Sequence, residues 1–176
     1  MSRVQAQCGD LPFLIRRDGS WLYRGTPIRR KEMICLFSSI MVRDAAGDYW
    51  LETPAVRGRI EVEDAPWLAV ELGWCGCGAD QCLTLRTNVD QVITLDDEHP
   101  IRLASEPDGR ELGGDGGPVP YVAVRQGLGV KPLEARITRP VYYELAALAV
   151  PKCVAGRRML GVWSLGSFFP LGDAVS

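Results

Sequence analysis

The sequence contains a single histidine, His99, in 176 residues. This count excludes every site that needs two histidines, including the paired-histidine helix of metalloproteases. The chain also lacks any run of about 18 consecutive apolar residues, the length that a membrane-spanning helix requires. Its first residues lack the apolar core of a secretory signal peptide. We therefore expect a cytoplasmic protein without a membrane span.

A strong net charge is absent as well. Lys and Arg number 20, and Asp and Glu number 22, so the formal net charge is -2. Proteins that attract nucleic acid through a general basic field carry a clear excess of Lys and Arg, and we expect no nucleic-acid partner. What is present is an ordinary globular composition, 47% hydrophobic and 24% charged. A chain of this length forms one domain or two small ones.

Six cysteines are present, and without a secretory signal free thiols are the expected state. The one cluster with the composition of a metal-binding site consists of Cys75, Cys77 and Cys82, because three thiolates together with His99 would complete a tetrahedral zinc site. The cluster lacks the repeated Cys-x2-Cys spacing of zinc proteins. We therefore favour a thiol-bearing loop over a metal site or a redox switch, and we predict no cofactor.

Hydrophobic periodicity predicts many strands and two helices. Alternating apolar residues around Asp18-Gly19 indicate a hairpin over residues 11–25, and later β-rich runs separated by Gly and Pro indicate an antiparallel meander. Apolar residues at i, i+3, i+4, i+7 and i+8 are typical of a helix packed on one face. The first such stripe comprises Met33, Leu36, Phe37, Ile40 and Met41, and the second comprises Tyr142, Leu145, Ala146, Ala149 and Val150. The second helix is expected to open around Pro140.

An internal repeat links the two helices. The pattern Ile28-x-Arg30-x5-Leu36 recurs as Ile137-x-Arg139-x5-Leu145, and an aromatic strand follows each helix. The sequence therefore predicts an α+β fold of two duplicated halves, each a small antiparallel sheet with one helix. We place the N-terminal repeat at residues 1–84 and the C-terminal repeat at residues 85–176.

The repeated arginines are the leading candidates for ligand binding. Arg30 and Arg139 each stand at the start of a predicted helix, where free backbone N–H groups and the helix dipole favour an anion. A guanidinium adds a bidentate grip on phosphate or carboxylate. The alternative is that both arginines form ion pairs with nearby carboxylates and only stabilise the fold. Further candidates for the same site are Thr53, Pro54, Asp64, Tyr142 and Ser164.

Several short motifs, taken in their order and spacing, resemble a bacterial family called domain of unknown function 1285. They include Asp18-Gly19-Ser20-Trp21, Tyr49-Trp50-Leu51-Glu52-Thr53-Pro54, Val62-Glu63-Asp64-Ala65-Pro66, Tyr142-Tyr143-Glu144-Leu145 and Trp163-Ser164-x-Gly166. The resemblance implies a core made by domain duplication, a C-terminal half superficially like pleckstrin-homology folds, and a ligand site at the interface between the halves. It also implies a nucleotide-like ligand and a role in signal transduction.

We therefore expect a ligand-binding or regulatory protein, without catalytic residues, whose partner is a nucleotide-like or other anionic small molecule. A protein partner is a further option. One alternative is a small enzyme acting on a phosphorylated or nucleotide substrate, with Glu63 or Asp64 as acid and base. Another is a protein-interaction scaffold, which would present a broad apolar surface patch.

Overall fold

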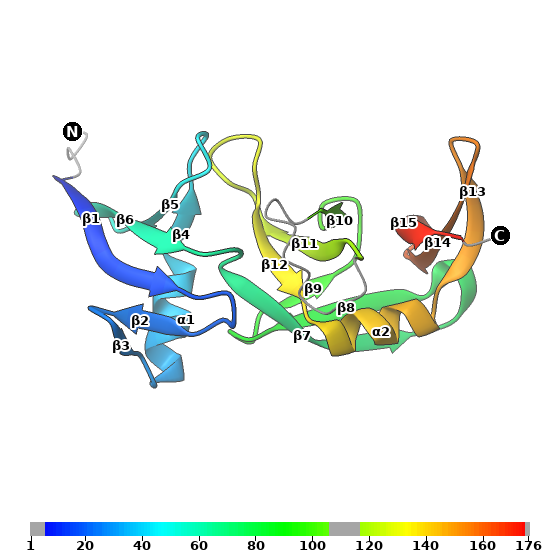
Figure 1. The fold of residues 1–176 in the computed structure, drawn as a ribbon, viewed down its shortest axis with the longest axis horizontal. Coiled ribbons are helices and arrows are strands. Elements are labelled where there is room, and N and C mark those ends of the chain that lie inside the picture. Colours follow the sequence, from blue (N-terminus) through cyan, green and yellow to red (C-terminus); the bar gives the residue numbers. More distant parts are fainter. Residues whose placement is uncertain (1–5, 106–116, 175–176) are drawn as a thin grey trace. The chain divides into compact units, whose positions relative to one another are not determined.

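The computed structural model describes residues 6–105 and 117–174. The chain divides into two compact units, the first built from residues 1–68, 88–90 and 124–134, and the second from residues 69–87, 91–123 and 135–176. Each unit contains strands and one α-helix (Figure 1), which confirms the prediction of an α+β fold in two halves. Neither helix in the described ranges combines the length and apolar character that a bilayer crossing demands.

The first unit is built on a six-stranded sheet with the order β3-β2-β1-β6-β5-β4. Its strands are β1 (Ala6–Ile15), β2 (Trp21–Tyr23), β3 (Thr26–Pro27), β4 (Met41–Arg43), β5 (Tyr49–Glu52) and β6 (Val56–Val62). The predicted hairpin is confirmed, because Phe13 lies opposite Tyr23 and Ile15 opposite Trp21. The prediction of a purely antiparallel sheet is wrong, since β1 and β6 run parallel. The helix between them in the chain provides the crossover that a parallel pair needs.

The helix of the first unit, α1 (Lys31–Ser39), packs through an aromatic cluster. The ring of Phe37 lies 5.0 Å from that of Phe13 and 6.2 Å from that of Trp21, centroid to centroid. Trp21 is fully buried. This cluster anchors α1 on the face of the sheet that carries Phe13 and Trp21.

The apolar stripe predicted for α1 is only partly correct. Met33 and Leu36 are 41% and 60% exposed, and α1 ends at Ser39, so Met41 opens β4 instead of extending the helix. Apolar residues occupy most of the circumference of α1, from Met33 to Phe37. Periodicity alone therefore did not identify the side that faces the sheet.

The second six-stranded sheet has the order β10-β11-β12-β7-β8-β9, and a three-stranded sheet has the order β13-β14-β15. The strands of the larger sheet are β7 (Trp67–Cys75), β8 (Cys82–Thr87), β9 (Val92–Thr94), β10 (Ile101–Ala104), β11 (Val119–Arg125) and β12 (Leu133–Ile137). Those of the smaller sheet are β13 (Val150–Val154), β14 (Arg157–Ser164) and β15 (Ser167–Asp173). A short 3-10 turn, η1 (Gly78–Asp80), separates β7 from β8.

The helix of the second unit, α2 (Arg139–Ala147), carries Pro140 in its first turn, as the sequence predicted. It buries Val141 and Leu145. Its predicted stripe extended too far, because Val150 already belongs to β13. In both units a nine-residue helix is followed by three consecutive antiparallel strands, β4-β5-β6 and β13-β14-β15.

Candidate functional site

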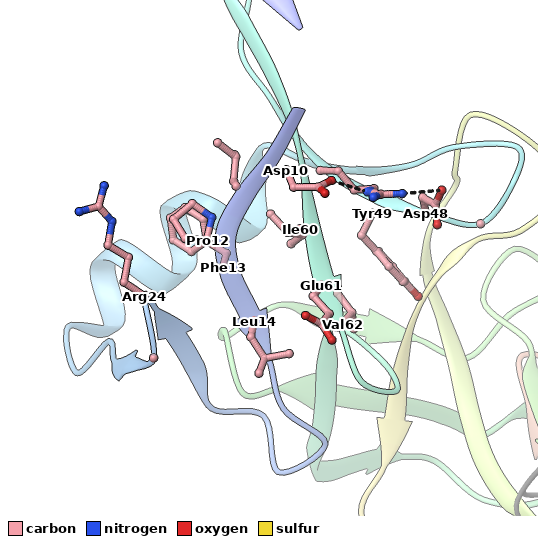
Figure 2. A pocket seen from close by; sticks show the side chains of 14 residues that line it. Asp10, Pro12, Phe13, Leu14, Arg24, Asp48, Tyr49, Ile60, Glu61 and Val62 are labelled. Carbon is pink, nitrogen blue, oxygen red and sulfur yellow. Dashed lines mark hydrogen bonds and ion pairs between the residues drawn. The ribbon is translucent and has the colours of Figure 1, made fainter. Parts of the chain in front are cut away.

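A groove of about 600 Å³ lies in the first unit (Figure 2). β1 and β6 form most of its wall, and the β2–β3 turn and the β4–β5 loop complete it. Apolar side chains such as Phe13 and Leu14 line it together with five charged ones, Asp10, Arg24, Asp48, Arg59 and Glu61. This mixture of apolar surface and a few charged groups is typical of small-molecule sites.

The groove lies along a stretch where the pairing register between β1 and β6 shifts. Between the pairs Gln7–Arg57 and Asp10–Arg59, β1 advances by three residues and β6 by two. β1 then advances by four residues to reach Leu14, while β6 advances by two to reach Glu61. Gly9, with φ of 60°, adopts the left-handed backbone that a bulge needs. The bulges leave residues of β1 without partners on β6, and the groove lies along them.

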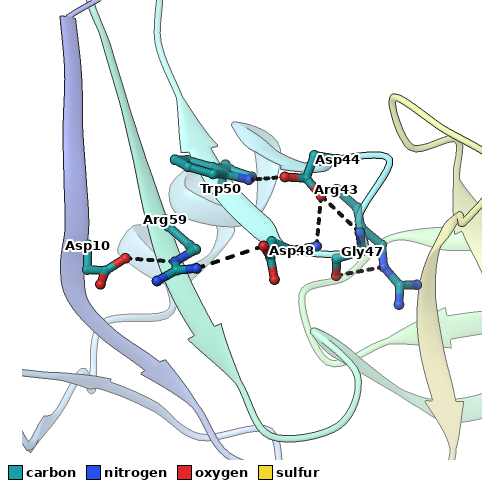
Figure 3. A network of polar contacts seen from close by, with 7 residues as sticks. All are labelled: Asp10, Arg43, Asp44, Gly47, Asp48, Trp50 and Arg59. Atoms are coloured by element: carbon teal, nitrogen blue, oxygen red, sulfur yellow. Dashed lines mark hydrogen bonds and ion pairs between the residues drawn. The ribbon is translucent and has the colours of Figure 1, made fainter.

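Arg59 joins two carboxylates at one end of the groove. Its Nε donates a hydrogen bond to Asp10 Oδ1 at 2.7 Å, and its Nη1 lies 3.8 Å from Asp48 Oδ2 (Figure 3). The hydrogen bond and charge of Arg59 hold the pKa of Asp10 below its usual value, and the same contact raises the pKa of Arg59. The charge of Arg59 is therefore already balanced within the protein.

Asp44 organises the β4–β5 loop that delivers Asp48 to the groove. Its Oδ1 accepts the N–H groups of Gly47 and Asp48, each at 2.9 Å, and its Oδ2 accepts the indole N–H of Trp50 at 2.8 Å (Figure 3). The guanidinium of Arg57 covers the ring of Trp50, 4.5 Å from the centroid. Burial alone would raise the pKa of Asp44, but these hydrogen bonds outweigh it and lower that pKa.

We expect Asp44→Asn to destabilise the first unit by about 1 kcal/mol at neutral pH, because the amide cannot accept all three hydrogen bonds in the same geometry. A carboxylate whose folded pKa is depressed stabilises the fold above its unfolded pKa and loses that effect as pH falls through the folded pKa. The difference between wild type and variant should therefore shrink below about pH 4. Urea unfolding at a series of pH values measures it, and a pH-independent difference would contradict the assignment.

Arg24 is the other arginine of the groove, and it lies in the two-residue turn between β2 and β3. Arg24 and Gly25 both have positive φ, 49° and 78°, as a type I′ hairpin turn requires. The guanidinium lies over the ring of Tyr23, 5.4 Å from its centroid. Among the described residues it has no carboxylate partner. Arg24 is thus an arginine at the groove whose charge has no ion-pair partner in residues 6–105 and 117–174.

The predicted ligand residues of the first unit lie outside this groove. Arg30 is the exposed N-cap residue of α1, and its carbonyl accepts the N–H groups of Met33 and Ile34. The hydroxyl of Thr53 accepts the N–H of Val56 at 3.0 Å and closes a turn. Pro54 is exposed in that turn, and Asp64 is half-buried after β6.

The other three predicted residues belong to the second unit. Arg139 is the exposed first residue of α2. The hydroxyl of Tyr142 donates to the carbonyl of Leu171 at 2.8 Å, and burial raises its pKa. Ser164 is fully buried, and its Oγ accepts the N–H of Leu83 at 3.0 Å. The ligand role of all seven residues stays a prediction.

The groove was not predicted from the sequence, although the sequence contains one signal for the turn that carries Arg24. Arg24-Gly25 between two short strands is a hairpin-turn signature with an unusual cation in the first turn position. For metals, no group of three His, Cys, Asp or Glu side chains within the described ranges is placed to hold an ion. Cys75, Cys77 and Cys82 are not such a group, and the role of these thiols stays a prediction.

Comparisons with known proteins agree on one family. A model described as "Domain of unknown function (DUF1285), N-terminal domain" matches residues 5–65, and one described as "Protein of unknown function (DUF1285), C-terminal domain" matches residues 66–171. A crystal structure of a DUF1285 family protein from Silicibacter pomeroyi DSS-3 is similar at 39% identity and a TM-score of 0.82, covering 97% of this chain and 85% of that one. A DUF1285 family protein from Shewanella baltica OS155 shares the fold, with 24% identity, a TM-score of 0.53, and coverage of 76% and 89%. No curated protein matches.

Proposed function

We propose that this chain, which belongs to the DUF1285 family, is a non-catalytic binding protein for a small anionic ligand of the nucleotide type. We place the ligand in the groove of the first unit, with Arg24 as the partner of its anionic group. The observation that carries the proposal is the unpaired guanidinium of Arg24 at a groove of about 600 Å³. Binding would serve regulation, with a role in signal transduction.

The size of the groove supports a small molecule. Ligand sites commonly enclose roughly 300–1,000 Å³, a range that accommodates a mononucleotide. Pro12 and Leu14, which are exposed and half-buried, offer apolar surface to the flat part of such a ligand.

The charges favour a ligand with one anionic end over a polyanion. The lining contains the arginines Arg24 and Arg59 and the carboxylates Asp10, Asp48 and Glu61, so the carboxylates outnumber the arginines. A chain of phosphates would meet repulsion from these carboxylates, whereas a single phosphate at Arg24 would gain a charge-assisted hydrogen bond. The carboxylates in turn can accept hydrogen bonds from sugar hydroxyl groups.

A catalytic role has weaker support. Glu63, one of the acid-base candidates, accepts the backbone N–H of Arg17 at 2.8 Å through its Oε2, a contact that fixes the chain entering β2. We therefore propose binding without turnover.

A regulatory output requires that the ligand binds two arrangements of the protein with different affinity. The short β2–β3 hairpin that carries Arg24 is the element that the ligand would order. The likeness of the C-terminal half to pleckstrin-homology folds stays a prediction.

A thermal-shift comparison of a mononucleotide, its nucleoside and inorganic phosphate tests the ligand class. We expect the mononucleotide to raise the unfolding temperature, because a ligand that binds only the folded state stabilises it by mass action. The nucleoside lacks the anion for Arg24 and should give a smaller rise at the same concentration. Equal shifts for nucleoside and mononucleotide, or no shift with any of the three, would contradict the proposal.

The arginines predicted from the sequence provide a discriminating control. In the same assay, Arg30→Ala and Arg139→Ala should retain the mononucleotide response if the groove holds the ligand. Arg30→Ala should itself be neutral or slightly stabilising, because it removes a cation from the positive end of α1. If both variants lose the mononucleotide response while a variant of Arg24 keeps it, the groove is not the ligand site and the repeated arginines are.

A further inference from the structure

We propose that Cys75 and Cys82 form a reversible disulfide across the end of the β7–β8 hairpin in the second unit. The two residues lie directly opposite each other in the antiparallel register of β7 and β8. Both are free thiols, Cys75 exposed and Cys82 half-buried. Side chains of directly opposed residues project from the same face of a sheet, so the two thiols are neighbours.

The hydrogen bonds around Leu83 define the type of pair. Leu83 donates its N–H to Ser164 Oγ at 3.0 Å, and its carbonyl accepts the N–H of Leu95 at 2.9 Å. Both backbone groups of Leu83 therefore point away from β7, and Trp74 and Leu83 form a pair without mutual hydrogen bonds. Because the two types alternate along an antiparallel ladder, Cys75 and Cys82 occupy a hydrogen-bonded pair.

The Cα separation of this pair type falls within the range of disulfides. Opposed Cα atoms in a hydrogen-bonded pair are typically about 5.5 Å apart, and disulfides span Cα separations of roughly 4.4–6.8 Å. Opposed Cβ atoms are typically about 4.5–5.5 Å apart and a disulfide needs roughly 3.5–4.5 Å, so closure draws together the adjoining ends of β7 and β8. A bond at an exposed hairpin end is also open to reduction, as labile and regulatory disulfides are.

The segment between the two cysteines supports the β14–β15 turn of the same unit. The N–H of Leu165 donates to the carbonyl of Gln81 at 2.8 Å, and that of Gly166 donates to the carbonyl of Ala79 at 2.9 Å. The side-chain amide of Gln81 donates to the carbonyl of Trp163 at 2.8 Å. Closing the disulfide fixes this segment, and through these bonds it fixes the turn of the three-stranded sheet.

The reaction needs an oxidant, for which we name a low-molecular-weight disulfide such as glutathione disulfide. The exposed Cys75 thiolate attacks one sulfur of the oxidant, forms a mixed disulfide and expels one glutathione thiolate. The Cys82 thiolate then attacks the Cys75 sulfur and expels the second. The protein loses two protons and two electrons as its S–S bond forms, and the oxidant gains them as two glutathione thiols.

Peptide mapping of the full chain after treatment with glutathione disulfide tests the proposal. We expect an intramolecular Cys75–Cys82 link, a rise in unfolding temperature of about 5 °C from the restricted unfolded chain, and reversal of both by a dithiol reductant. Cys75→Ser and Cys82→Ser should each abolish the rise. Cys153→Ser, which removes an exposed thiol on β13, should retain it.

Three results would overturn the proposal. The first is a map in which glutathione remains attached to Cys75 or Cys82 without ring closure. The second is a link that runs through Cys77 or Cys153 instead of the cross-strand pair. The third, a Cys75–Cys82 link that forms in the wild type and leaves the unfolding temperature unchanged, would overturn the inference that closure fixes the segment between the cysteines.

Discussion

Replacement of Arg125 by methionine should lower the free energy of unfolding of the first unit by about 3 kcal/mol. The half-buried guanidinium donates through Nη2 to the carbonyls of Ser38 at 2.9 Å and Met41 at 2.7 Å, where α1 ends and β4 begins. It also lies over the buried ring of Trp67, 5.3 Å from the centroid. Burial lowers the pKa of Arg125. Methionine fills similar space but donates to neither carbonyl, so that of Met41 loses this hydrogen bond and that of Ser38 keeps the N–H of Ile40.

Urea unfolding followed by tryptophan fluorescence measures this loss. Arg125→Lys is the matched control, because it keeps the positive charge and much of the length but not the planar fork. We expect the lysine variant to fall between wild type and the methionine variant. A methionine variant within about 0.5 kcal/mol of wild type, the range of ordinary surface substitutions, would show that Arg125 does not hold the end of α1.

Substitution of Gly161 by alanine should destabilise the second unit by about 3 kcal/mol, the upper end of overpacking effects. A Cβ atom on Gly161 would clash with the carbonyl oxygen of Phe169 and would meet the ring of Phe168 at 2.7 Å. The carbonyl belongs to the neighbouring strand, so it can retreat only by disturbing the β14–β15 ladder. The ring of Phe168 packs edge-on against Trp163, with centroids 5.4 Å apart, which limits its own movement.

Gly172→Ala is the matched control for this substitution. Gly172 lies on β15 in the same hairpin, and a Cβ atom there would meet nothing within 4 Å. We expect the Gly172 variant to unfold within about 0.5 kcal/mol of wild type in the same urea titration. Equal stability of the two alanine variants would mean that the close approach at Gly161 is relieved without loss of packing.

The elements set by local sequence were the ones that could be predicted. The β1–β2 hairpin follows from alternating apolar residues on either side of Asp18-Gly19, and its register matches that pattern. Both helices begin where Arg30 and Arg139 were expected to mark their starts. Family membership followed from the order of several short motifs spread over the chain, which the comparisons bear out.

Features that depend on contacts between distant segments could not be predicted from the sequence. The parallel pairing of β1 with β6, and the bulges that give rise to the groove, arise from register between segments 47 to 50 residues apart. Leu36 and Phe37 both fit the helical period and both were expected to face the sheet, yet Phe37 packs on Phe13 whereas Leu36 is exposed. The sequence predicts only that Cys75 and Cys82 belong to a thiol-bearing loop. Their position opposite each other becomes known from the β7–β8 register.

The central claim, that the unpaired guanidinium of Arg24 holds the anion, is tested most directly by calorimetric titration of a mononucleotide into Arg24→Asn. Asparagine is favoured in the first position of a type I′ turn, so the variant should fold at least as stably as wild type. Ala155→Asn is the control, since Ala155 and Gly156 form the equivalent turn between β13 and β14, with φ of 50° and 79°. We predict that Arg24→Asn loses about 10- to 100-fold in affinity, as expected for one charge-assisted hydrogen bond, while Ala155→Asn binds like wild type. Wild-type affinity in a folded Arg24→Asn would contradict the claim.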